Sequence, residues 1–138
     1  MGVCQDRVVI ITGAGGGLGA AHAKVFAAEG AKIIVNDINQ EAAQKVVDDI
    51  KAAGGDAVVN TSDITNYDDS LNAVKQAIDT FGDLHVVLNN AGINRDRMFA
   101  SMTEADWDAI MAVHLKGHFC ITSHAVHYWR GQSKEGKA

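Results

Sequence analysis

A glycine-rich run near the amino terminus has the composition of a phosphate-binding loop. It spans residues 12–19 (TGAGGGLG) and follows a short apolar run at residues 8–11. Glycine at such a junction lets the backbone approach a pyrophosphate, whose oxygens then bind free N–H groups at the start of the next helix. No lysine follows at the position that a P-loop needs, which argues against an ATPase. The glycines alone also fit an ordinary flexible turn, so both interpretations stay open.

Asp37 has the spacing of an acidic residue that binds ribose hydroxyls. It follows a second apolar run, residues 33–35, and stands 18 residues after Gly19. In dinucleotide-binding proteins an acid about 20 residues beyond the glycines accepts hydrogen bonds from the ribose 2′-hydroxyl. A 2′-phosphate at that place meets a like charge, so the predicted cofactor is NAD and not NADP. Aspartate after a strand can instead cap the next helix, and this alternative also stays open.

Three residues near the carboxyl end could suggest a metal site. Cys120, His124 and His127 fall on one helical face. Because no fourth ligand is spaced to complete a zinc set, we predict a packed or partner-facing helix surface and no metal.

Composition narrows the class of protein. The chain has 138 residues, 47% of them hydrophobic, a net charge of −5 and two distant cysteines. This is enough for one domain with its own core. The acidic balance argues against nucleic acid or an acidic membrane as partner, and the cysteines favour a reducing, cytoplasmic location. The longest apolar runs are about four residues, far short of a membrane span.

Short β-branched runs alternate with helical stretches along the chain. The runs, which we expect to be strands buried on both faces, are residues 8–11, 33–35, 57–59 and 86–88. The first helix is expected from about Gly17 to Gly30, with Leu18, Ala21 and Val25 on one face. The second is expected to carry Ala43, Val46, Ile50 and Ala53, and to end at Gly54.

Two capping boxes predict where the later helices begin. Thr65 and Asp68 are expected to open a third helix that ends at Gly82, and Thr103 and Asp106 a fourth. The fourth helical region is expected to continue to about Trp129, followed by a loose polar stretch at residues 131–137. The whole pattern predicts an α/β fold, a doubly wound parallel sheet of Rossmann type with about four strands in the order 3-2-1-4.

Three motifs on these elements resemble the short-chain dehydrogenase/reductase family. They are Thr12-Gly13-x-x-x-Gly17-x-Gly19, Ser62-Asp63-Ile64 and Asn89-Asn90-Ala91-Gly92, and the similarity runs from about Arg7 to Trp129. The resemblance implies an NAD-dependent oxidoreductase that moves a hydride between nicotinamide and a hydroxy/oxo substrate. It implies four groups of cofactor-binding residues: Gly13, Gly17, Leu18 and Gly19 at the pyrophosphate, Asp37 at the adenosine ribose, Asp63 and Ile64 at the adenine, and Asn90, Ala91 and Gly92 near the nicotinamide ribose.

A narrower resemblance concerns the branch within the family. Residues 90–97, 106–108 and 113–117 are similar to those of (3R)-hydroxyacyl-CoA dehydrogenase modules and 3-oxoacyl reductases. This implies a 3-hydroxyacyl thioester as a candidate substrate.

His114 departs from the family pattern, which usually has asparagine at this position. The resemblance implies that this asparagine joins a serine, a tyrosine and a lysine in a water-mediated proton relay. Two roles are therefore open for His114: a catalytic one through a relay water, or that of a buried helix histidine that satisfies only its own hydrogen bonds.

The tyrosine and lysine of that relay are not found in this chain. Tyr67 and Tyr128 have no lysine four residues on. We therefore expect residues 1–138 to be the cofactor-binding portion of a longer enzyme, ending before the Tyr-x-x-x-Lys segment and inactive alone. The alternative is a non-catalytic nucleotide-binding or interaction half-domain. The apolar stripe Leu115, Phe119, Val126 and Trp129 predicts a homo-dimer or homo-tetramer, with core packing of this stripe as the alternative.

Overall fold

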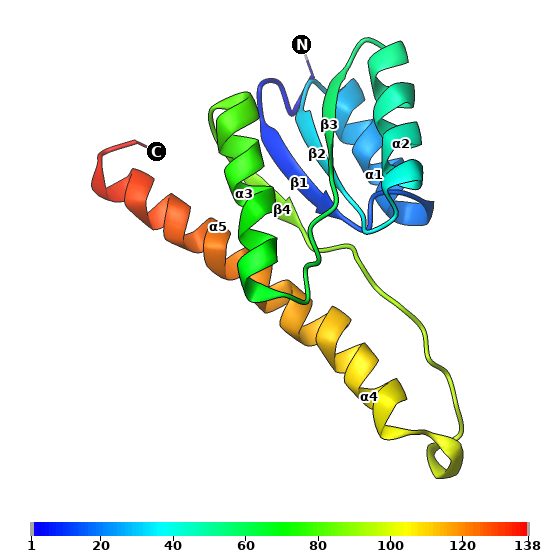
Figure 1. Cartoon of the computed structure of the whole chain (residues 1–138). Helices are drawn as coiled ribbons and strands as arrows, with labels where there is room; N and C mark the ends of the chain where they lie inside the picture. Colours follow the sequence, from blue (N-terminus) through cyan, green and yellow to red (C-terminus); the bar gives the residue numbers. More distant parts are fainter. Residues whose placement is uncertain (1, 138) are drawn as a thin grey trace.

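Four parallel strands form one sheet in the order β3-β2-β1-β4 (Figure 1). The computed structural model describes residues 2–137, so the two ends of the predicted domain, Met1 and Ala138, lie outside the described residues. The strands are β1 (Val8–Thr12), β2 (Lys32–Asn36), β3 (Asp56–Asn60) and β4 (Val86–Leu88). The predicted strands, their order and the α/β class are confirmed.

Helices cover both faces of this sheet. The helices α1 (Gly17–Ala28) and α2 (Gln40–Ala52) pack against Val9 and Ile11 of β1. The helices α3 (Tyr67–Phe81) and α5 (Gly117–Lys134) pack against Val8 and Ile10 on the opposite face. Because successive side chains of a strand point to opposite faces, one apolar run supplies both cores.

Burial differs between the middle and the edges of the sheet. All five residues of β1 are buried, as predicted. The three residues of β4 are only half-buried, so the prediction of burial on both faces is wrong for this strand. Within residues 2–137, only β1 pairs with β4, which leaves its other edge without a neighbouring strand.

The buried face of α1 differs from the predicted one. Leu18 and Val25 are exposed, and the buried residues are Gly19, Ala23 and Ala27. At its start the helix lies so close to the glycine loop that a Cβ atom on Gly19 would collide with the carbonyl oxygen of Gly13. In α2 the buried residues include Ala43, Val46 and Ile50, as the periodicity predicted, whereas Ala53 is exposed beyond the end of the helix.

The start of α3 is shifted by one residue from the predicted box. Asn66 is the N-cap, and its side chain accepts a hydrogen bond from the backbone N–H of Asp69. Thr65 is not available as a cap, because its N–H and hydroxyl both donate to Asp63 Oδ1. The predicted box of Thr103 and Asp106 is confirmed.

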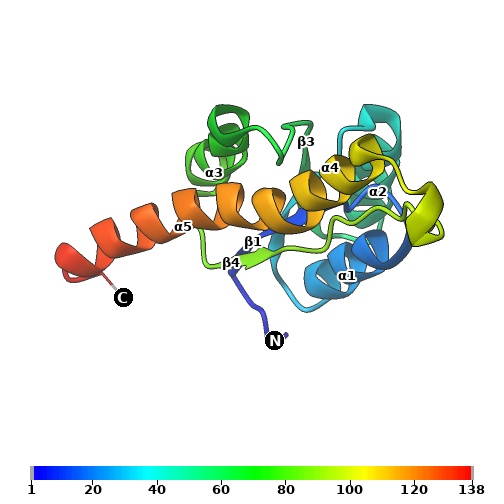
Figure 2. The same ribbon diagram turned by 90° about the horizontal axis from the view of Figure 1, so that it is seen from below.

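The last third of the chain forms an arm and one long helix (Figures 1 and 2). After β4 the chain runs away from the sheet to a short helical turn, η1 (Phe99–Ser101), and returns as α4 (Glu104–Met111). A π-helical segment, η2 (Ala112–Lys116), joins α4 to α5. The helix continues to Lys134, so the predicted end near Trp129 and loose stretch from residue 131 are wrong.

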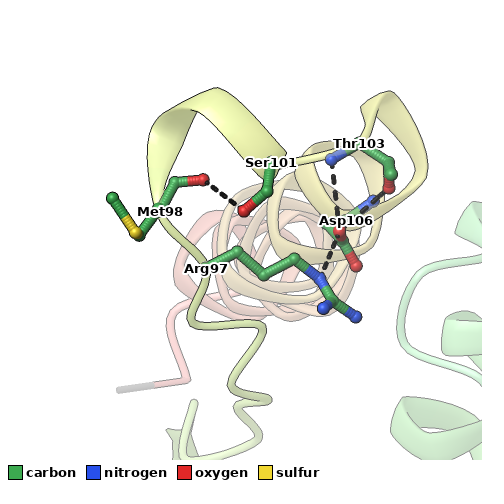
Figure 3. A network of polar contacts seen from close by, with 5 residues as sticks. All are labelled: Arg97, Met98, Ser101, Thr103 and Asp106. Atoms are coloured by element: carbon green, nitrogen blue, oxygen red, sulfur yellow. Dashed lines mark hydrogen bonds and ion pairs between the residues drawn. The ribbon is translucent and has the colours of Figure 1, made fainter.

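A charged pair ties the arm to the start of α4 (Figure 3). Arg97 Nε lies 2.8 Å from Asp106 Oδ2, which also accepts hydrogen bonds from the N–H and hydroxyl of Thr103. These bonds hold the pKa of Asp106 below its usual value, the Thr103 hydroxyl contributing most. Among the described helices, none is long and apolar enough to cross a membrane.

Candidate functional site

A groove of about 550 Å³ lies at the carboxyl ends of the strands. Most of the predicted cofactor residues line it: Gly13, Leu18, Asp37, Asp63, Ile64, Asn90, Ala91 and Gly92. The groove wall also contains residues that were not predicted to bind the cofactor: Gly16, Asn36, Ile38, Ser62, Thr65, Ile93 and Val113. Of the predicted set, Gly17 and Gly19 do not line the groove and belong to the first turn of α1.

Close backbone packing shapes the glycine loop. Gly13 has a φ of +61°, and a Cβ atom there would lie 2.8 Å from the Cα of Ala91. A Cβ atom on Gly19 would collide with the carbonyl oxygen of Gly13 and lie 2.5 Å from Asn90 Nδ2. These two glycines therefore let β1, α1 and the segment after β4 meet at one point.

Hydrogen bonds of Asn90 and the buried Thr12 hold the end of β1 and the segment after β4 together. Asn90 Nδ2 donates to the carbonyl oxygens of Thr12 and Gly13, at 3.0 and 3.3 Å. The backbone N–H groups of Asn90 and Ala91 donate to Thr12 Oγ1, at 3.1 and 3.0 Å. Thr12 belongs to the predicted glycine motif but was assigned no role of its own, although a hydroxyl between a buried strand and the glycines was a signal for one.

The start of α1 differs from that of the other helices that begin at a loop. Its N-cap is Gly16, which provides no side-chain hydrogen bond, and its first turn holds no acidic residue. By contrast, α2, α3 and α4 are capped by the side chains of Asn39, Asn66 and Thr103, and each has an acid in its first turn. The positive end of the α1 dipole is thus left for an external anion such as a pyrophosphate.

Asp37 closes one side of the loop. Its Oδ2 atom accepts the backbone N–H of Gly15 at 2.9 Å, and its Oδ1 atom accepts that of Asn39 at 2.9 Å. The side chain that caps α2 is that of Asn39, so the alternative that Asp37 is the cap is wrong. A Cβ atom on Gly15 would lie 2.7 Å from Asp37 Oδ2, so the loop and the carboxylate fit each other only because this residue is glycine.

The opposite side of the groove is built from the segment after β3. Asp63 Oδ1 binds Thr65, at 2.8 Å to its N–H and 2.7 Å to its hydroxyl. Ile64 is buried, and Gly117 of α5 lies so close to it that a Cβ atom there would be 2.9 Å from Ile64 Cδ1. Asn36 Nδ2 donates to the carbonyl oxygen of Ser62, which fixes the segment to β2.

His114 lies beside Gly92 and Ile93, two residues of the groove wall. Its Nε2 atom is 2.8 Å from the carbonyl oxygen of Ile93 and 3.1 Å from the nitrogen of the same residue. The side chain is exposed, so the predicted alternative of a buried histidine is wrong. Its predicted part in a proton relay stays a prediction.

Neither tyrosine of the chain lines the groove. Tyr128 donates its hydroxyl to Asp83 Oδ1 at 2.7 Å, and burial together with this bond raises its pKa to about 12. The Tyr67 hydroxyl lies 3.4 Å from Ser123 Oγ. Among residues 2–137 no cluster of three potential metal ligands occurs, and His124 and His127 are hydrogen-bonded to backbone carbonyl oxygens.

The sequence matches the profile of a known family. The profile of the short chain dehydrogenase family matches residues 7–138. The chain therefore belongs to the short chain dehydrogenases, as the three motifs predicted.

Relatives of several kinds share this similarity. Peroxisomal multifunctional enzyme type 2 of Mus musculus is 46% identical over 138 residues, covering 94% of this chain and 18% of the relative. Hydroxyacyl-CoA dehydrogenase ChsB1 of Mycobacterium tuberculosis is 42% identical, covering 96% of this chain and 43% of the relative. A crystal structure of a short chain dehydrogenase from Mycobacterium avium superposes with a TM-score of 0.96 at 54% identity, over 99% of this chain and 52% of that one. The chain thus spans about half or less of the length of these relatives.

Proposed function

We propose that the groove binds NAD, in a protein that transfers a hydride between nicotinamide and a hydroxy/oxo substrate. The observation that carries this proposal is the charge of the groove wall. Among residues 2–137, those that line it include two carboxylates, Asp37 and Asp63, and neither lysine nor arginine. The uncapped start of α1 supports a pyrophosphate at the middle of the groove. Bound NAD would supply the hydride chemistry, and these residues would hold and orient it.

The same charge supports NAD over NADP. Asp37 Oδ2 already holds the N–H of Gly15, which fixes the carboxylate at the rim where a ribose hydroxyl can donate to it. A 2′-phosphate there would face this carboxylate with no lysine or arginine of the groove wall to balance it. Such like-charge contacts cost several kcal/mol, and each ~1.4 kcal/mol is tenfold in affinity, so the preference for NAD is expected to be at least about tenfold.

Calorimetric titration of the intact protein with NAD and NADP tests the cofactor. The wild-type protein is expected to bind NAD more tightly, and Asp37→Ala to bring the two affinities closer together. Asp48→Ala, which removes an exposed carboxylate of α2 outside the groove, is the matched control and should leave the ratio unchanged. Equal affinities in the wild type, or an unchanged ratio in Asp37→Ala, would contradict the assignment.

The names of two relatives guide the proposed substrate. Because the relatives include a hydroxyacyl-CoA dehydrogenase and peroxisomal multifunctional enzymes, we propose a 3-hydroxyacyl thioester. As neither Tyr67 nor Tyr128 lines the groove, we assign proton transfer to the Tyr-x-x-x-Lys segment of a longer protein. NAD reduction by such a thioester tests this, and NAD binding without turnover would favour the non-catalytic module instead. The cytoplasmic location stays a prediction.

We also propose that the protein self-associates through its long helix. Asp108, Met111, Leu115 and Phe119 share one shallow groove on its outer side, and Leu115 and Phe119 are each 62% exposed. Trp129 does not belong to this surface, because its Nε1 atom donates to the carbonyl oxygen of Leu84. A two-fold axis at Phe119 would pair the helices of two copies in antiparallel directions. Asp108 of one copy would then lie opposite Arg130 of the other, since both residues are eleven positions from Phe119.

A further inference from the structure

The His114 side chain contacts backbone atoms of Ile93, which lines the groove, and His114 itself lies in a segment that is wider than an α-helix. It belongs to the π-helical turn η2 and reaches the segment that follows β4. In this turn Val113 lines the cofactor groove, whereas Leu115 and Lys116 line the shallow groove on the outer side of the helix. The turn therefore places Val113 in the groove wall and the His114 ring against Ile93, another residue of that wall. Wide turns of this kind are often found at functional sites.

We infer that His114 is a positioning residue that holds the turn of Gly92 and Ile93 in place for the cofactor. The inference rests on the proposed binding of NAD, because this turn forms part of the groove wall. Within residues 2–137, the hydrogen bonds of Gly92 and Ile93 to side chains are those between Ile93 and His114 Nε2, whereas the N–H groups of Asn90 and Ala91 donate to Thr12. Thr12 thus fixes the first half of the segment 90–93, and the His114 imidazole fixes the second half.

The chemistry of imidazole limits how many hydrogen bonds His114 can make to Ile93. His114 Nε2 lies within hydrogen-bonding distance of both the carbonyl oxygen and the nitrogen of Ile93. One ring nitrogen either carries a proton and donates, or lacks it and accepts. It therefore satisfies one backbone group of Ile93 at a time. A primary amide has a separate oxygen and NH₂ group, so an asparagine that reached this place would serve both.

Gly92 and His114 also fit each other sterically. A Cβ atom on Gly92 would lie 2.9 Å from His114 Cε1, closer than real Cβ contacts. A side chain at position 92 would therefore push the imidazole away from Ile93. The hydrogen bond between His114 and Ile93 therefore requires that residue 92 has no side chain.

Replacement of His114 tests the inference in the intact protein. His114→Ala is expected to weaken NAD binding about threefold to tenfold, the usual effect of losing one hydrogen bond. The amide of Ile93 should also exchange with solvent faster in this variant. His114→Asn should restore both the affinity and the protection, a rescue that general destabilisation of the helix would not produce. His118→Ala removes a histidine one turn later on the same helix, outside the groove, and should change neither quantity.

A double-variant cycle tests the steric part. Gly92→Ala is expected to weaken NAD binding in the wild type and to weaken it much less in the His114→Ala background, because the colliding ring is then gone. Additive effects would overturn the coupling. Wild-type affinity and wild-type Ile93 exchange in His114→Ala would overturn the positioning role while leaving the effect of Asp37→Ala, and so the proposed function, intact. If the protein binds neither NAD nor NADP, the proposed function fails, and Ile93 exchange still decides whether His114 holds the turn.

Discussion

The cofactor groove and the long helix differ in how their side chains are satisfied. Around the groove, β1 is buried along its whole length, and Thr12 and Asn90 bind the backbone segments that meet there. Along the helix, α4 has no buried residue, and Leu115 and Phe119 remain largely exposed. The first region is stabilised by contacts within the chain, whereas the second presents apolar side chains that only further contacts can cover. A substitution of similar size should therefore affect folding when it is made at the groove, and assembly when it is made on the exposed face of the long helix.

The largest expected effect is that of a methyl group at Gly19. Its Cβ would collide with the carbonyl oxygen of Gly13, and overpacking of this kind costs about 1–3 kcal/mol. Gly19→Ala is expected to lower the free energy of unfolding by that amount and to abolish measurable NAD binding. Gly16→Ala is the control, because a Cβ atom there meets nothing within 4 Å and the backbone is extended. Chemical denaturation should show Gly16→Ala within about 0.5 kcal/mol of wild type, and equal losses in both variants would contradict the packing argument.

The next largest effect is expected at Phe119, where a substitution should change assembly clearly and folding only slightly. Phe119→Glu should shift the intact protein toward monomers, raising the dissociation constant about tenfold or more, because two carboxylates would face each other at the proposed axis. Val25→Glu is the matched control, since Val25 on α1 is 63% exposed, nearly the same as Phe119 at 62%. Light scattering should find its assembly unchanged. An unaltered assembly in Phe119→Glu with the fold intact would show that this face is no interface.

The smallest effect concerns Tyr128, which joins the long helix to the base of the sheet. Burial and the bond to Asp83 raise its pKa from 10.0 to about 12. Because the folded pKa lies above the unfolded one, the neutral phenol contributes stability that is complete below pH 10 and is lost as the pH rises to about 12. Unfolding measured across this range should show a steeper loss for wild type than for Tyr128→Phe. Parallel pH curves for the two proteins would contradict this account.

Much of the fold and of the groove could be predicted from the sequence. The strands are short, continuously apolar runs, and such runs are visible because a buried parallel strand needs apolar residues on both faces. Asp37, Asp63 and Asn90 each follow a strand, and the carboxyl ends of parallel strands meet at one edge of the sheet. Their convergence on one groove therefore follows from the order of the elements.

The errors arose where spacing between elements decides the outcome. The periodicity of α1 favoured its large residues, but the helix buries Gly19, Ala23 and Ala27, and at Gly19 the close approach to Gly13 leaves no room for a side chain. Thr65 and Asn66 can both cap a helix, and the bond from Thr65 to Asp63 decides between them. The contact of His114 with Ile93 depends on a wide turn, which a 3.6-residue period cannot reveal.

The π-helical turn η2 also sets the rotational phase of the helix before it. A turn closed by bonds between residues five apart holds one residue more than an α-helical turn. If residues 112–116 were α-helical, α4 would be rotated by about 100° around its axis relative to α5. Asp106, whose carboxylate holds Arg97 at 2.8 Å, would then face a different direction relative to α5 (Figure 3). One additional residue thus determines the direction in which the arm presents Met98 and Phe99, which are 80% and 90% exposed.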